Sequence, residues 1–426
     1  MNVKIYPSKV NGEISAPPSK SVTHRAIIIA SLANGKSVID NALIAEDTLR
    51  TIDALKALGV DIQRDGNKIT INGSNGKLKA PAKPIFLGNS GSTMRMIAAV
   101  CALADGETTL TGEKRLCQRP VGELIDALNK IGIKAYSVNN NGCPPIKIKG
   151  GKISGGNIVI KGDISSQYIS ALLLVAPFAK ESLTTKIDGE LVSKPYVALT
   201  IDIMKTFCVN VQKNNFQNFT IEKGQQYKGK SYTIEGDYSS ASYFFAAAAI
   251  TNGSVTVKNL SVNSSQGDKY FLELLEKMGC YIKKEIDGFT VVGKKLNGIE
   301  IDMSDYPDIV QTLTVVAAFA KGTTKINNIG HLRYKESDRI ETTIKELKKM
   351  GVKVNYDDKS LNIEGGNPKG TSIDTHNDHR VAMSFAIAAL GAQGKTVIQN
   401  AEVVRKSYPA FFEDLQKIGA KIEVLP

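Results

Sequence analysis

The sequence predicts an α/β protein built from six copies of one repeated unit, because two short phrases recur together along the 426 residues. The first phrase closes a helix, usually with a Gly, and leads into a strand. Its copies are spaced by 68 to 76 residues, and their third positions are Gly59, Gly132, Cys208, Gly279, Gly351 and Gly419. The second phrase is a run of small apolar residues, usually a Gly, and a short β-like stretch. It keeps the same period, with copies beginning at 31, 101, 176, 246, 317 and 388.

Each unit should therefore contain a buried helix, a strand, an amphipathic helix and two further strands. In the first unit the amphipathic helix begins at Glu46-Asp47 and is capped by Gly59, and Asp65-Gly66 marks a hairpin turn. The elements that we predict for this unit are a helix over 20–34, a strand over 36–41, a helix over 46–58 and strands over 60–64 and 68–72.

Composition fits a chain with two hydrophobic cores, since 42% of the residues are apolar and three units per domain is the simple division. No apolar run approaches the roughly 18 residues of a membrane span, and the N-terminal residues lack the apolar core of a signal peptide. The five cysteines form no CxxC pair. We expect a cytoplasmic protein with reduced thiols. The net charge of +12 suggests anionic partners, either nucleic acid or small phosphorylated metabolites.

Basic residues gather at the starts of the buried helices. Five of the six segments that enter these helices carry Ser or Asp where an N-cap is expected, and the second offers Asn89 or Ser90. A helix start already carries about half a positive charge, so further cations there do not stabilise the helix. One such Arg is most simply a solvated charge, but three in equivalent positions predict a site for a phosphate or carboxylate. The cations are Lys20, Arg25, Arg95 and Arg380.

Two standard motifs occur only in outline. Residues 224–231 fit GxxxxGK[ST], but strand-like residues follow where that nucleotide-binding motif needs a helix, so we interpret them as a hairpin turn. His376 and His379 hint at a metal, yet the chain has only four histidines and no suitable third ligand lies nearby. A helix start capped by Asp378 is the preferred interpretation. We expect no metal and no organic cofactor.

Polar clusters lie at the junctions between units. They cover residues 113–120, 165–167, 193–196 and 333–339. The last cluster could be a helix cap with solvated charges, which is a fair interpretation of Ser337 and Asp338. Lys335, Glu336 and Arg339 cannot all face solvent if this helix start points to the same side as the others. Converging helix starts, basic residues and a few carboxylates predict a reaction between two polyanions.

The residues of these clusters resemble the motifs of the 5-enolpyruvylshikimate-3-phosphate synthases (3-phosphoshikimate 1-carboxyvinyltransferases), within the enolpyruvyl transferase family. The match runs in order along the whole chain as far as Lys406. It rests on residues 18–26 (PSKSVTHRA), 88–95 (GNSGSTMR), 162–167 (GDISSQ), 335–339 (KESDR) and 377–380 (NDHR).

The resemblance implies a two-domain inverted (inside-out) α/β barrel with three βαβαββ-type units per domain. The N-terminal domain would cover 15–235 and the C-terminal domain 1–14 and 236–426, with the active site in the cleft between them. The chain would cross twice, near 14–18 and 235–237, which would make a hinge.

The implied reaction transfers the enolpyruvyl group of phosphoenolpyruvate to the 5-hydroxyl of shikimate 3-phosphate by addition and elimination, and releases phosphate. It belongs to the shikimate pathway of aromatic amino acid biosynthesis. The implied partners are these two anionic small molecules, with no nucleic acid, membrane, metal or organic cofactor, and the protein is expected to be a monomer.

The resemblance also implies roles for single residues. Asp308 matches the general base, Glu336 the proton donor, and Lys20 and Lys406 the cations that stabilise phosphate charge and share proton transfer. The implied contacts of shikimate 3-phosphate are Lys20, Ser21, Arg25, Ser165, Ser166, Gln167, Ser193, Tyr196, Asp308 and Lys335. The implied contacts of phosphoenolpyruvate are Lys20, Gly91, Arg119, Gln167, Arg339, Arg380 and Lys406.

Some positions depart from the family pattern, and two other functions remain as alternatives. His331 stands where many members have an Asn that contacts shikimate 3-phosphate, and Met96 stands where Pro is usual. The related UDP-N-acetylglucosamine enolpyruvyl transferases use a reactive Cys several residues before an Arg-Pro, whereas Cys117 lies two residues before Arg119. A repeat-built nucleic-acid-binding clamp would instead scatter its basic residues over a face with stacking aromatics.

Overall fold

The computed structural model describes residues 1–357 and 360–425 and divides the chain into two compact units. Unit 1 consists of Met1–Pro17 and Glu235–Pro426, and unit 2 is Pro18–Ile234. Each unit has its own hydrophobic core.

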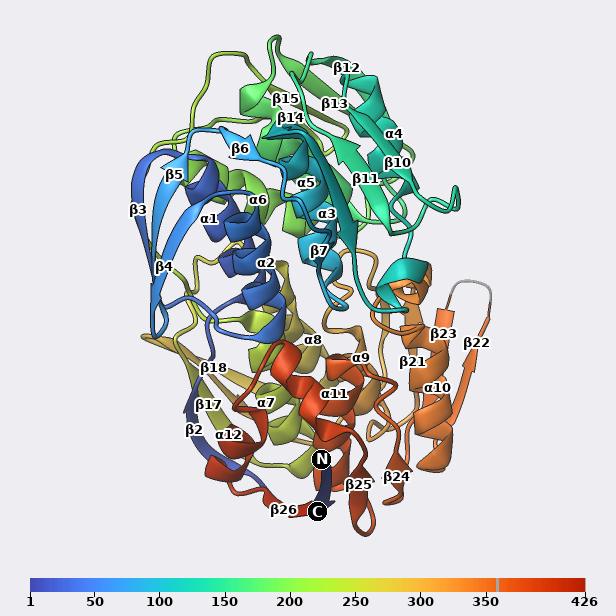
Figure 1. The fold of residues 1–426 in the computed structure, drawn as a ribbon. Coiled ribbons are helices and arrows are strands. Elements are labelled where there is room, and N and C mark those ends of the chain that lie inside the picture. Colours follow the sequence, from blue (N-terminus) through green and yellow to red (C-terminus); the bar gives the residue numbers. More distant parts are fainter. Residues whose placement is uncertain (358–359, 426) are drawn as a thin grey trace. The chain divides into compact units, whose positions relative to one another are not determined.

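Two kinds of α-helix alternate along the described residues, as the repeat predicts (Figure 1). Buried helices, apolar on nearly every side, are α1 (Lys20–Leu32), α3 (Gly91–Val100), α5 (Ser166–Val175), α7 (Tyr238–Thr251), α9 (Val310–Ala317) and α11 (His379–Gly391). The helices with an exposed polar face are α2 (Glu46–Ala57), α4 (Gly122–Lys130), α6 (Lys194–Thr206), α8 (Tyr270–Met278), α10 (Arg339–Lys349) and α12 (Phe411–Lys417). The helix, strand and turn order predicted for the first unit is confirmed, with differences of a few residues at the ends.

Three four-stranded sheets belong to unit 2, and each joins one parallel pair to two antiparallel pairs. In sheet order they are β16 (Ser231–Thr233), β3 (Asn34–Asp40), β5 (Lys68–Ser74) and β4 (Asp61–Asp65); β7 (Ile85–Phe86), β9 (Glu107–Thr111), β11 (Ile146–Lys149) and β10 (Lys134–Ser137); and β12 (Gly156–Lys161), β13 (Leu183–Asp188), β15 (Asn218–Ile221) and β14 (Gln212–Asn214). A short parallel pair, β6 (Leu78–Lys79) and β8 (Ala104–Asp105), completes this unit.

Unit 1 repeats the same sheet pattern three times. In order its strands are β2 (Asn11–Ser15), β17 (Ser254–Lys258), β19 (Gly288–Val292) and β18 (Tyr281–Glu285); β20 (Glu300–Asp302), β21 (Thr323–Asn327), β23 (Ser360–Glu364) and β22 (Lys353–Tyr356); and β24 (Ser372–Ile373), β25 (Thr396–Ile398), β1 (Asn2–Tyr6) and β26 (Lys421–Leu425). Figure 1 shows the two chain ends side by side, because β1 pairs antiparallel with β26.

The helices form the inside of each unit. In unit 1, α7, α9 and α11 pack against one another, and in unit 2 α3 packs against α5 and α2 against both α1 and α3. Within the described residues every four-stranded sheet has two open edges, so the strands close no barrel. The predicted α/β class, with helices inside and sheets outside, is confirmed.

The predicted N-caps are confirmed at four of the buried helices. Ser19, Ser165, Asp237 and Asp378 each accept a hydrogen bond from a backbone N–H in the first turn. Ser90 is the N-cap of α3, but its hydroxyl pairs with Thr93 Oγ1 at 2.7 Å. The prediction is wrong at α9, where the N-cap is Ile309 and no side chain caps the helix. Its neighbour Asp308 instead pairs with two arginines.

Candidate functional site

Arg25 in the second turn of α1 is a buried cation held by neutral groups. Its Nε donates to Thr200 Oγ1 at 2.7 Å, and its two other nitrogens donate to the carbonyls of Ser21 and Tyr196 at 2.9 and 3.2 Å. Burial lowers the pKa of Arg25 to about 10, which still leaves the guanidinium charged at neutral pH. A charge removed from water without a carboxylate beside it is costly, so this arrangement favours binding of an anion.

Lys20, at the first position of α1, pairs with Asp47 in the first turn of α2, with Nζ and Oδ2 3.2 Å apart. Buried hydrogen bonds also join α1, α2 and α3. His24 Nδ1 lies 2.7 Å from Thr51 Oγ1, and Thr51 Oγ1 lies 2.8 Å from Thr93 Oγ1. Burial lowers the pKa of His24 to about 3, so the ring is neutral and serves to hold these helices together.

Gln167 in the first turn of α5 connects two helices of unit 2. Its Oε1 accepts from Arg95 Nη1 at 2.7 Å, and its Nε2 donates to Ser92 Oγ at 2.8 Å, both from α3. The guanidinium of Arg95 also lies over the ring of Tyr168, 5.4 Å from the centroid. These contacts fix the Gln167 amide at the helix start that the sequence predicted to bind ligand.

Gly91 begins α3 directly against Arg119. A Cβ at this position would come within 3.0 Å of the Arg119 guanidinium, so only a glycine leaves the cation in place. Arg119 is 3% exposed, and its Nη1 donates to the carbonyl of Asn89 at 3.3 Å. The structure therefore brings together these two residues, which were predicted separately.

The remaining predicted residues of unit 2 lie at helix starts. Ser165 Oγ caps α5 by accepting from the N–H of Gln167 at 3.3 Å, and the buried Ser166 follows it. Ser193 precedes α6 in the left-handed backbone region with φ 57°, and Tyr196 lies in the first turn of that helix. Within unit 2 the predicted residues thus come from the first two turns of α1, from the starts of α3, α5 and α6, and from the segment that carries Arg119.

Arg339, the first residue of α10, is the centre of a cluster in unit 1. Its Nε lies 2.9 Å from Asp378 Oδ2, one Nη lies 2.7 Å from Glu336 Oε2, and the other lies 3.2 Å from Asp308 Oδ1. Burial pulls the pKa of Arg339 down, but the three carboxylates outweigh it and raise the pKa above its ordinary value. We call Arg339 and these acids the Arg339 cluster.

Two further cations adjoin the Arg339 cluster. Arg380 Nη2 lies 2.8 Å from Asp308 Oδ2, and Arg380 Nη1 lies 3.3 Å from the hydroxyl of Tyr243 on α7. Lys406, buried in the short helix η6 (Ala401–Lys406), has its Nζ 3.9 Å from Glu336 Oε1. Both predicted acid–base carboxylates therefore lie between cations. Lys335, at the end of η5 (Gly330–Tyr334), lies next to Glu336 in the chain and is partly exposed.

His331 in η5 is a buried imidazole beside this cluster. Its side chain is 6% exposed, and its Nε2 has no hydrogen-bond partner among the described residues. Burial lowers its pKa to about 3, with the charge of Lys335 acting in the same direction and that of Asp308 opposing it. A neutral ring with one open nitrogen can still offer a hydrogen bond to a ligand at the position where an Asn is usual.

Sequence reasoning missed several residues that hold the predicted ones. Thr200 sits inside α6 and gives no sequence signal, although its hydroxyl binds Arg25. Asp47 was interpreted only as helix-start chemistry, and Asp378 only as an N-cap. In the structure Asp378 has two roles. Its Oδ1 caps α11 by accepting from the N–H of Arg380 at 2.9 Å, and its Oδ2 forms an ion pair with Arg339. Tyr243 lies among apolar residues of α7 and looks like a core residue in the sequence, although its hydroxyl contacts Arg380.

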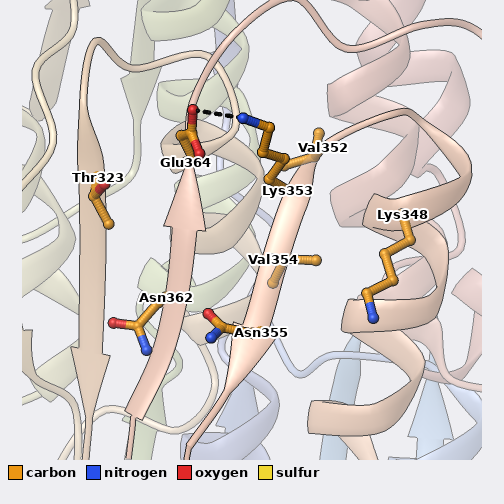
Figure 2. Close-up of a pocket in the computed structure, with 8 residues that line it drawn as sticks. All are labelled: Thr323, Lys348, Val352, Lys353, Val354, Asn355, Asn362 and Glu364. Carbon is orange, nitrogen blue, oxygen red and sulfur yellow. Dashed lines mark hydrogen bonds and ion pairs between the residues drawn. The ribbon is translucent and has the colours of Figure 1, made fainter.

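A groove of about 510 Å³ lies elsewhere on unit 1 (Figure 2). It is formed by β21, β22, β23 and α10, and Figure 2 shows Lys353 paired with Glu364 at one end. None of the predicted site residues lines it. Its lining residues are Thr323, Lys348, Val352, Lys353, Val354, Asn355, Asn362 and Glu364.

The described residues contain neither a metal-type cluster nor a membrane-spanning helix. In the part of the chain that the structure describes, no three His, Cys, Asp or Glu side chains lie together as a metal site would require. His379 begins α11 behind its cap Asp378, in agreement with the preferred interpretation of that segment. Across residues 1–357 and 360–425, no helix has both the length and the apolar character needed to cross a membrane.

Comparisons with known proteins agree over the whole chain. Residues 5–415 match the family described as EPSP synthase (3-phosphoshikimate 1-carboxyvinyltransferase). The chain is 46% identical over 426 residues to the 3-phosphoshikimate 1-carboxyvinyltransferase of Methanocella arvoryzae and 44% identical over 432 residues to that of Methanosarcina mazei, with all of each chain covered. An EPSP synthase structure from Acinetobacter baumannii superposes with a TM-score of 0.83 at 28% identity, again with full coverage of both chains.

Proposed function

Since the chain belongs to the EPSP synthase family, we propose that it transfers the enolpyruvyl group of phosphoenolpyruvate to the 5-hydroxyl of shikimate 3-phosphate. Members of this family carry the name 3-phosphoshikimate 1-carboxyvinyltransferase, and neither the UDP-sugar transferase nor the nucleic-acid clamp is favoured by the matches. The observation that carries the proposal for this chain is the buried Arg25. Its hydrogen bonds go to a hydroxyl and two carbonyls, so a phosphate would supply the missing negative charge.

The shikimate 3-phosphate contacts that we propose include the residues at the helix starts of unit 2. Shikimate 3-phosphate carries a phosphate and a carboxylate, and the buried Arg25 is the cation proposed to pair with one of these anionic groups. The full proposed set is Lys20, Ser21, Arg25, Ser165, Ser166, Gln167, Ser193, Tyr196, Asp308 and Lys335.

Phosphoenolpyruvate carries a phosphate and a carboxylate, which suit the guanidinium groups because each can form paired hydrogen bonds with two oxygens. The proposed contacts are Lys20, Gly91, Arg119, Gln167, Arg339, Arg380 and Lys406. Gly91 contributes through its size, since any side chain there would displace Arg119.

The chemistry needs a base at the 5-hydroxyl and an acid at the methylene carbon of phosphoenolpyruvate. Asp308, held by Arg339 and Arg380, takes the hydroxyl proton as the oxygen attacks the carbon that bears the phosphate. Glu336 gives a proton to the methylene carbon, which becomes a methyl group. Loss of phosphate and of one methyl proton from the tetrahedral intermediate then restores the double bond.

Glu336 lies between Arg339 and Lys406, and these cations favour its ionised form. Binding of a phosphate and a carboxylate beside the same cations offsets part of their charge. This favours the protonated acid at the moment when the reaction needs a donor. Lys20 and Lys406 stabilise the charge of the departing phosphate.

The protein should release phosphate from phosphoenolpyruvate when shikimate 3-phosphate is present and no metal is added. Asp308→Ala should lower kcat by about 10²- to 10⁴-fold, because it removes the base, and change KM much less. Equal losses in kcat and in substrate binding would make Asp308 a binding residue. Phosphate release with UDP-N-acetylglucosamine as acceptor instead, or with neither acceptor, would refute the proposed function.

A further inference from the structure

Asp268 is a buried acid in unit 1 that the proposed mechanism does not use. It lies in the short helix η4 (Gly267–Lys269) just before α8, and it is 4% exposed. Its Oδ2 accepts a short hydrogen bond from Ser239 Oγ in the first turn of α7. Both residues are buried, so the hydroxyl and the carboxyl hold each other in place.

Hydrogen bonds connect the segment that carries Asp268 to the start of α7. Gln266 Nε2 donates to Glu235 Oε1 at 2.8 Å and to the carbonyl of Gly236 at 2.7 Å. Gln266 Oε1 accepts from the N–H of Tyr238, the first residue of α7, at 3.2 Å. Because these bonds satisfy a buried amide, η4 has one fixed position relative to α7.

An aromatic stack joins this segment to the one that carries Asp308. Tyr270, two residues after Asp268, stacks on Tyr306, two residues before Asp308, with ring centroids 4.5 Å apart and planes at 24°. The stack therefore holds the chain segment that carries Asp268 against the segment that carries Asp308.

The charges around Asp268 support this proximity. Burial is the main reason why the pKa of Asp268 rises to about 7, and the charge of Asp308 is the next. Asp237, the cap of α7, acts in the same direction, whereas the Ser239 hydrogen bond and Arg380 on α11 oppose the rise. Asp268 thus holds a proton for much of the time near neutral pH, while Asp308 forms ion pairs with the guanidinium groups of Arg339 and Arg380.

We propose that Asp268, held by Ser239 and linked through the Tyr270–Tyr306 stack, is a positioning residue that keeps the Asp308 carboxylate in place and ionised as the base. This inference rests on the proposed function, in which Asp308 takes the hydroxyl proton. Asp268 itself touches no substrate. Because Asp268 carries the proton of the pair, the buried Asp268 and the partly exposed Asp308 share a single negative charge, and that charge is on the group that reacts.

The kinetic test compares Asp268→Ala, Asp268→Asn and Ser239→Ala in the phosphate-release assay. Asp268→Ala and Ser239→Ala should each lower kcat about tenfold or more, with both KM values within about threefold, because only the base is displaced. Asp268→Asn keeps the acceptor for Ser239 and resembles the protonated acid, so it should restore most of kcat. It should also remove an inflection near pH 7 from the kcat profile.

Glu222→Gln is the matched control. Its carboxylate accepts from Ser182 Oγ at 2.6 Å on the exposed surface of unit 2, so the same kind of bond is altered away from Asp308. Wild-type kinetics in this control are expected. If kcat of Asp268→Ala stays within about twofold of the control, the positioning role is refuted.

A second measurement needs no activity and separates this inference from the proposed function. Because the folded protein keeps the Asp268 proton above its ordinary pKa of 3.8, its contribution to stability is present at low pH and is lost as pH rises toward 7. Urea unfolding at several pH values should show this loss in the wild type and not in Asp268→Asn. In Asp308→Asn the loss should occur at lower pH, and an unchanged pH range would refute the link between the two acids, whether or not the protein transfers enolpyruvyl groups.

Discussion

Gly91→Ala is the substitution whose effect follows most directly from the geometry of the site. The new methyl group would lie within 3.0 Å of the Arg119 guanidinium, whereas ordinary contacts begin at 3.4 Å. The guanidinium atoms would lie 2.3–2.5 Å from the new methyl carbon, so the guanidinium must move by about 1 Å. Arg119 is 3% exposed and already bonded to the carbonyl of Asn89, so it has little room to move without losing its direction.

The expected consequence is weaker binding of phosphoenolpyruvate. A hydrogen bond to a charged group contributes about 1.5–3 kcal/mol, which corresponds to a rise of roughly 10- to 150-fold in KM if the contact is lost. KM for shikimate 3-phosphate should change little, because Arg25 and Lys20 lie on α1 and keep their partners. The free energy of unfolding should fall only slightly, since the clash is with the end of a flexible side chain.

The assay is steady-state phosphate release with each substrate varied in turn. Gly151→Ala is the matched control. Gly151 lies in the same unit as Gly91, and a Cβ there would meet no atom within 4 Å. If Gly91→Ala and Gly151→Ala have the same KM for phosphoenolpyruvate, the close approach of Gly91 to Arg119 does not govern binding, and the reasoning fails.

Two further variants test the groups that hold the cations. Thr200→Val removes the hydroxyl that binds Arg25 Nε and should raise KM for shikimate 3-phosphate by roughly 10- to 150-fold while KM for phosphoenolpyruvate stays constant. Asp378→Asn keeps the cap of α11 but leaves Arg339 one carboxylate short, and should lower the free energy of unfolding by about 3–5 kcal/mol in urea titrations.

Each of these two variants has a control in the chain. Thr206→Val removes an exposed hydroxyl from the same helix as Thr200 and should leave both KM values unchanged. Glu364→Gln breaks the exposed pair with Lys353 seen in Figure 2 and should leave stability unchanged. A Thr200→Val enzyme with normal KM, or an Asp378→Asn protein as stable as the Glu364→Gln control, would contradict the roles assigned to these residues.

The repeat made most of the fold predictable, because each copy keeps the same register of apolar residues and closing Gly. The helix predicted over 46–58 is observed as α2, Glu46–Ala57, and the hairpin turn predicted at Asp65-Gly66 is observed one residue later, at Gly66-Asn67 between β4 and β5. Amphipathic helices and hairpins are governed by local chemistry, which a single sequence shows.

The partners of the site residues were not predictable in the same way. Arg339 binds Asp308, Glu336 and Asp378, and two of these lie 31 and 39 residues away in the chain. Thr200 is 175 residues from Arg25 and looks like any helical threonine. Such contacts depend on how helices pack within a unit, and the sequence pattern contains no direct sign of which polar side chains then meet.

The start of α9 shows how the site departs from the repeat that builds it. At α11, Asp378 both caps the helix and binds Arg339, so one carboxylate serves stability and position together. At α9 no side chain caps the helix, and Asp308, one residue before the N-cap, binds Arg339 and Arg380 instead. The missing cap lowers the stability of the helix by about 1 kcal/mol. The ion pairs of Asp308 offset this loss only if its carboxylate is fixed in good geometry with Arg339 and Arg380. The deviation agrees with the proposed role of Asp308 as the base, and the proposed role of Asp268 is to keep this carboxylate in position.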